Sequence, residues 1–133
     1  MMKNRLKALL PLVAAAFAVC AVAAPPDPTI FNTEEMTWDV GPANGITLKR
    51  FIGDLVGMNL VRWAAGTSRA PHTHVNEQIM LVQSGSYRIT VEGQAHTLHA
   101  GELMIVPSYA LHGIEALEDS EHIAVYSPAA FGN

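Results

Sequence analysis

Short apolar or alternating runs follow one another from Ile46 onward, separated by glycine, proline, serine or aspartate. Each run is long enough for one β-strand, and none keeps helical spacing over ten positions behind an N-terminal cap. The runs cover residues 46–51, 54–64, 78–83, 86–92, 94–98, 103–106, 111–116 and 121–126. Strands at this spacing predict an all-β antiparallel sandwich or barrel.

Glycines mark the predicted reversals. The runs 78–83 and 86–92 meet at Ser84-Gly85, which predicts a hairpin, and Gly93 marks the next reversal. The segment 33–36 could begin one short turn of helix.

The first residues have the pattern of a leader rather than of a fold. Three basic residues precede an apolar run over 9–22, and alanines at 21 and 23 suit a signal peptidase. We therefore expect a signal peptide over 1–23, cleaved after Ala23, and a periplasmic or secreted protein. An uncleaved anchor is the alternative, although the run is short for a membrane span. Prolines then predict an extended arm over 24–44, followed by one folded domain over 45–133.

Charge and cysteine content narrow the functional classes. Cleavage would change the net charge from −4 to −7, because 1–23 holds three of the eight basic residues and none of the twelve acidic ones. An acidic chain lacks the basic surface that nucleic acid or an anionic membrane requires, so neither is an expected partner. The only cysteine, Cys20, lies in the leader, so no disulfide is expected.

Histidines two positions apart are the first candidate chemistry. On a strand, His72 and His74 would leave the same face and could bind one ion. The same parity includes Gln78 and excludes Glu77, which could instead orient a histidine ligand or lie in solvent. A turn at 75–76 would remove this argument. The alternative for the pair is a polar surface position on a sheet.

Two motifs in register resemble the cupin family. The first pairs His72, His74 and Gln78 with flanking glycines at 66 and 85. The second runs from Gly101 through Pro107 and Tyr109 to His112. In the family form, glutamate stands at the Gln78 position and glycine at the Tyr109 position.

This resemblance implies a double-stranded β-helix, a small jelly-roll barrel, with a metal ion in one mouth. By position, the ligands of one divalent ion are His72, His74, Gln78 and His112. Four neutral ligands would leave the ion its full charge, which favours an anionic substrate oxygen. Imidazole and amide ligands accept Mn, Fe, Co, Ni or Zn.

A narrower resemblance is to the pectin-degradation cupins that open unsaturated uronates. It rests on the His-x-His-x-x-Glu-Gln-Ile segment, Ala100-Gly101-Glu102, His112-Gly113 and the late Tyr126-Ser127-Pro128. That group has a catalytic aspartate and an arginine where this chain has Ala124 and Ala130.

Two further residues are candidates for catalysis. Arg62 shares parity with Met58 and Leu60 and could reach into the barrel to hold a substrate carboxylate, the alternative being a surface position. Tyr126 and Tyr109 could donate a proton or line the pocket, the alternative for both being core packing with a satisfied hydroxyl.

The other three histidines, His96, His99 and His122, lack a partner at ligand spacing, and we expect them on the surface or satisfied in the core.

Three functions remain open from the sequence. The first is a metal-dependent isomerase or lyase acting on a small anionic sugar-derived or hydroxy or keto acid. The second is a metal-dependent dioxygenase, and the third is a module that binds a ligand or metal without turnover. A homodimer paired through sheet edges is expected.

Overall fold

The computed structural model describes residues 27–129 of the 133-residue chain. The expected signal peptide, Cys20 and the Ala130 position lie outside the described residues. The structure divides after Phe31. Residues 27–31 have no regular secondary structure, and all ten strands belong to the second unit. No helix within 27–129 has the length and apolarity needed to cross a membrane.

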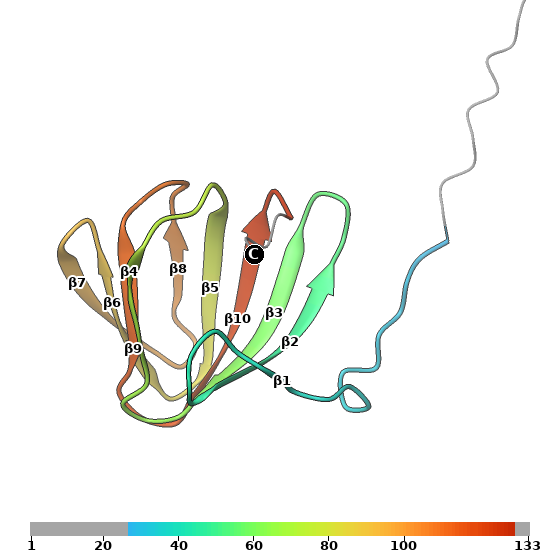
Figure 1. Cartoon of the computed structure of the whole chain (residues 1–133), viewed down its shortest axis with the longest axis horizontal. Coiled ribbons are helices and arrows are strands. Elements are labelled where there is room, and N and C mark those ends of the chain that lie inside the picture. The colour runs from blue at the N-terminus through green and yellow to red at the C-terminus, as the bar shows by residue number, and fades with distance from the viewer. Residues whose placement is uncertain (1–26, 130–133) are drawn as a thin grey trace, which may run out of the picture. The chain divides into compact units, whose positions relative to one another are not determined.

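The larger of two antiparallel sheets has six strands in the order β1-β2-β3-β10-β5-β8 (Figure 1). Its strands are β1 Asp39–Val40, β2 Ile46–Ile52, β3 Gly57–Trp63, β10 Ser120–Ser127, β5 Glu77–Ser84 and β8 Leu103–Val106. The chain reaches β10 last, and β10 inserts between β3 and β5. Long-range pairing of this kind is typical of a jelly roll.

The smaller sheet has four strands in the order β4-β9-β6-β7, at the left of Figure 1. Its strands are β4 Ser68–His72, β9 His112–Ala116, β6 Ser86–Val91 and β7 Gln94–His99. The expected all-β jelly-roll barrel is therefore confirmed.

Alternation along the strands builds the core between the sheets. On β3 the buried positions are Gly57, Asn59, Val61 and Trp63, and the positions between them are less buried. Side chains from both sheets form one apolar cluster. Its buried members are Ile46, Leu48, Val61, Trp63, Met80, Val82, Tyr87, Ile89, Leu98 and Ala116.

The strand predictions hold within a few residues, with two additions. The hairpin at Ser84-Gly85 is present between β5 and β6, and Gly93 turns the chain into β7. The pattern did not predict β1, which lies within the expected arm, or β4, whose residues are mostly exposed and polar. Residues 33–35 form a hydrogen-bonded turn and no helix.

Candidate metal centre

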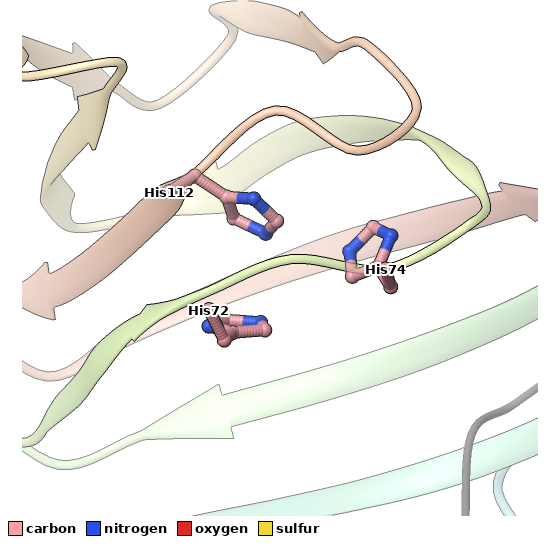
Figure 2. A group of neighbouring side chains, drawn as sticks. All are labelled: His72, His74 and His112. Atoms are coloured by element: carbon pink, nitrogen blue, oxygen red, sulfur yellow. The ribbon is translucent and has the colours of Figure 1, made fainter.

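Three histidines meet at one mouth of the barrel. His72 ends β4, His112 begins β9 opposite it in the strand register, and His74 lies in the segment between β4 and β5. One nitrogen from each ring lies within 4.8 Å of the others. Figure 2 shows the rings facing a common space. Their centroids are 4.5 to 5.8 Å apart.

Each ring is held by a hydrogen bond from Nδ1 to a backbone carbonyl two residues away. The acceptors are Ala70 for His72 at 3.0 Å, Asn76 for His74 at 2.9 Å and Ala110 for His112 at 2.8 Å. Because a carbonyl oxygen only accepts, Nδ1 must carry the proton in all three rings. The lone pair is therefore on Nε2, as in metal-binding histidines whose other nitrogen is tied to the protein.

Gln78 completes the cluster from β5. Its Oε1 lies 3.2 Å from Nε2 of His74. With Nδ1 protonated, both of these atoms are acceptors, so they do not satisfy each other in this orientation of the amide. Two ligands bound about 2.1 Å from one ion lie about 3 to 3.4 Å apart at octahedral or tetrahedral angles. The donor set therefore fits a divalent cation.

Electrostatics favour the neutral imidazole at His72 and at His112. Burial is the main cause that lowers the pKa of His72 and of His112 below the usual value, and the nearby Arg69 guanidinium lowers both further. A histidine must be deprotonated to bind a metal, so this environment reduces the competition from protons.

A cavity with about 70 Å³ of water-accessible space opens inward from the histidines. Arg69 on β4 and Tyr126 on β10 line it together with His72, His112 and Gln78. The ring of Tyr126 lies 5.8 Å from that of His74. Burial raises the pKa of Tyr126, with Arg69 and Arg50 opposing the shift, so its hydroxyl is a donor at neutral pH.

The parity argument for Gln78 was wrong although Gln78 does lie in the cluster. The strand ends at His72 and the chain bends at 75–76 before β5 begins, so His74 and Gln78 do not share a continuous strand. The bend itself brings the two side chains together.

The expectation that Arg62 reaches into the barrel was also wrong. Arg62 points outward from β3, where its Nε lies 2.7 Å from Glu121 and its guanidinium lies 3.9 Å from the centre of the Trp38 ring. Parity with Met58 and Leu60 selected the outer face, because both faces of β3 carry apolar residues. The arginine that lines the cavity is Arg69, which the sequence did not single out.

The other tyrosine and histidine candidates lie outside the cluster of His72, His74 and His112. Tyr109 is 67% exposed at a positive φ of 64°, so the expectation of core packing was wrong, and this backbone explains the glycine of the family form. His96 and His99 are exposed. His122 is buried and bonded to the hydroxyl of Tyr87 at 2.9 Å, as expected of a satisfied histidine. Glu77 is exposed.

Sequence reasoning missed Asn76. It is 3% exposed, its carbonyl accepts from His74, and its Nδ2 donates to the carbonyl of Pro128. An asparagine in a turn between two strands was the available signal.

Ala124 lies on β10 between the inward-facing His122 and Tyr126 and is fully buried. The position where the resemblance implies an aspartate therefore faces the barrel but holds only a methyl group.

Comparison with known proteins agrees with this architecture. The cupin domain family matches residues 59–127. The pectin degradation protein KdgF of Dickeya dadantii is 31% identical over 103 residues, which cover 74% of this chain and 91% of the relative.

Two solved structures resemble the barrel. The structure of KdgF from Halomonas sp. superposes with a TM-score of 0.72 at 28% identity, covering 77% of this chain and 96% of that one. An RmlC-like cupin from Shewanella frigidimarina has a TM-score of 0.71 at 20% identity, covering 77% and 93%, and shows the fold alone. The chain therefore belongs to the cupin family, as a small cupin similar to KdgF.

Proposed function

We propose that this chain binds one divalent metal ion on His72, His74, His112 and Gln78 and isomerises a small sugar-derived hydroxy or keto acid. The observation that carries the proposal is the convergence of three Nε2 lone pairs and one amide oxygen on a common space. The similarity to a pectin degradation protein, KdgF of D. dadantii, supports a sugar acid as substrate.

The substrate would bind across the mouth. A divalent ion bound there would supply Lewis-acid polarisation of a substrate carbonyl or hydroxyl oxygen. Arg69 would hold the carboxylate, since its planar guanidinium can donate two hydrogen bonds to it. Tyr126 would donate a hydrogen bond to a substrate oxygen near His74, because its phenol stays protonated.

Metal content is tested first. Tag-free protein should contain about one divalent ion per chain by elemental analysis, and His112→Ala should lose it. Metal-loaded protein should then convert unsaturated uronates, and the loss of their ultraviolet absorbance measures this conversion.

Arg69→Ala and Arg62→Ala form a matched pair for the anion site. Arg69→Ala should keep the metal and raise KM by about 10-fold or more, because a charge-assisted pair to the carboxylate is lost. Arg62→Ala should change neither metal content nor KM, since Arg62 lies on the outer face.

Failure to retain any of Mn, Fe, Co, Ni or Zn would refute the metal site, and uronate left intact by loaded protein would refute the reaction.

A second candidate is binding without turnover. It is favoured by Ala124, because the methyl group at this buried, barrel-facing position cannot transfer a proton. Tight uronate binding with recovery of intact ligand would support it. Oxygen uptake by the iron-loaded protein would instead support the dioxygenase function.

The proposal that the protein is exported depends on residues outside the described part of the chain. The basic start, the apolar run and the alanines at 21 and 23 support a cleaved signal peptide. N-terminal sequencing of protein from the periplasm or medium should begin at Ala24, and a start at Met1 would contradict this.

A further inference from the structure

The cavity continues inward past the level of the metal ligands. Strand register places Tyr126 beside Gln78 at the mouth, Ala124 between Asn59 and Met80 one level deeper, and His122 deeper still. Successive inward residues on a strand are about 7 Å apart, so the cavity passes through distinct levels. At the second level, Ala124 contributes only a methyl group.

Two buried polar atoms on β3 have no hydrogen-bond partner among the described residues. They are Oδ1 of Asn59, a side chain 7% exposed, and Nε1 of Trp63, a residue 5% exposed. Both side chains line the cavity. A buried polar group without a partner costs about 1 to 3 kcal/mol, so its retention calls for a ligand or a water that completes it.

His122 adds a third polar group on the same wall. Its Nδ1 is bonded to Tyr87, which leaves Nε2 as the nitrogen able to serve a ligand. Its ring lies 6.3 Å from that of Trp63. Burial lowers the pKa of His122 to about 3, so the ring is neutral at physiological pH.

The rest of the inner wall is aliphatic. The residues are Ile46, Leu48, Val61, Met80, Ile89, Val106 and Ile114. Asn59, Trp63 and His122 are neutral, and Arg69, the charged side chain of the lining, stands at the mouth with His72 and His112. A charged group moved to the inner levels would lose its hydration without a counter-charge.

We propose that the inner cavity is a binding site for the uncharged, hydroxyl-bearing part of a small ligand. Asn59 would accept a hydrogen bond from this part of the ligand, and Trp63 would donate one to it. A hydroxyl can donate to Oδ1 of Asn59, and a second oxygen can accept from Nε1 of Trp63. The whole cavity, mouth included, has about 70 Å³, room for roughly five water-sized groups, which limits the inner part to a short hydroxylated chain. That the ligand's carboxylate points outward to the mouth rests on the proposed function. The inner binding site does not depend on that function.

The indole N–H of Trp63 is a direct reporter. The chain has two tryptophans, so the ¹⁵N–¹H spectrum should show two indole signals, assigned with Trp38→Phe. Titration of the zinc-loaded protein with glycerate should shift the Trp63 indole signal. The Trp38 signal should stay, because that ring lies on the outer face beside Arg62.

Propionate, which lacks the hydroxyls, is the paired probe. It should bind at least 10-fold more weakly and leave the Trp63 indole signal unchanged. A Trp63 signal that moves with neither probe, or equally with both, would overturn the proposal and would indicate water as the sole occupant.

Asn59→Leu separates binding from folding. It removes the unpaired oxygen, so the melting temperature should stay or rise, while the preference for glycerate over propionate should disappear. Asn44→Leu, at an exposed position before β2, should keep the preference. An Asn59→Leu protein that keeps the preference would also overturn the inner site.

Failure here is distinguishable from failure of the proposed reaction. A protein that leaves uronates intact yet shows the glycerate response keeps the inner site and loses the reaction. A protein that converts uronates, but whose Trp63 indole signal does not respond to glycerate, would support the reaction and refute the inner site.

Discussion

Asn76 acts on the candidate metal centre through His74. Its carbonyl accepts the Nδ1 proton of His74, and its side chain anchors the bend to the carbonyl of Pro128. Such supporting contacts fix the direction in which the ligand nitrogen points.

Asn76→Ala should therefore weaken metal binding by roughly 10- to 100-fold. Titration against a competing chelator measures the loss. Glu77→Ala, at the exposed neighbour, is the matched control and should bind metal as tightly as the wild type. Equal affinity in both variants would show that the bend keeps His74 in place without Asn76.

The buried His122 should make the fold less stable in acid. Its pKa is about 3 in the folded chain and about 6.5 when unfolded. As the pH falls below 6.5, the imidazole of His122 binds a proton in the unfolded state but stays neutral in the folded state. The free energy of unfolding from this group should therefore decrease by up to about 1.4 kcal/mol per pH unit toward pH 3, and it should be constant above 6.5.

Urea unfolding of the metal-free protein between pH 7 and 4 tests this. His122→Leu should lower stability at pH 7 and flatten the decline with acidity relative to the wild type. His96→Gln, at an exposed position, should leave the decline unchanged. Parallel curves for His122→Leu and the wild type would remove His122 as the cause.

At the scale of elements, the β5–β6 hairpin depends on Gly85. Its φ is +73°, and an added Cβ would lie 2.1 Å from Oγ of Ser120 and 2.6 Å from the carbonyl oxygen of Asp119. Gly93 also has a positive φ, +80°, but an added Cβ there meets nothing within 4 Å.

Gly85→Ala should therefore reduce the free energy of unfolding by about 3 kcal/mol, from backbone strain and steric overlap together. Gly93→Ala should cost about 1 kcal/mol, from the backbone alone. Chemical denaturation compares the two variants. Equal losses would mean that the chain around Ser120 relaxes freely.

At the scale of the molecule, the outer faces of the two sheets differ. Each outer face carries an ion pair at 2.7 Å, Arg88 with Glu115 on the four-stranded sheet and Arg62 with Glu121 on the six-stranded sheet. The six-stranded sheet carries side-by-side apolar residues across β3, β10, β5 and β8. They are Met58, Leu60, Ile123, Val125, Ile79, Leu81, Leu103 and Ile105. An apolar patch of this kind is complementary to itself and suits a two-fold pair.

We therefore predict a homodimer through this face, rather than through the sheet edges alone. Leu81→Glu should give a monomer in sedimentation velocity while keeping the metal, because Leu81 points away from the barrel interior. Thr90→Glu, on the outer side of the other sheet, should remain dimeric. A monomeric wild type at micromolar concentration would refute the dimer.

The sequence by itself determined eight of the ten strands, the glycine turns and the histidines of the candidate metal centre. Strand period and turn chemistry are local properties of the chain. The family motifs located His72, His74, Gln78 and His112 without any coordinates.

Only the tertiary structure decided which face of a strand is inside and which side chains meet across the mouth. On β3, Leu60 and Val61 are both apolar, so alternation could not tell the outer Arg62 from the inner Asn59. Arg69 and Asn76 depend on the bulge in β4 and the bend before β5. Their roles follow from contacts with segments distant in sequence, which no local pattern encodes.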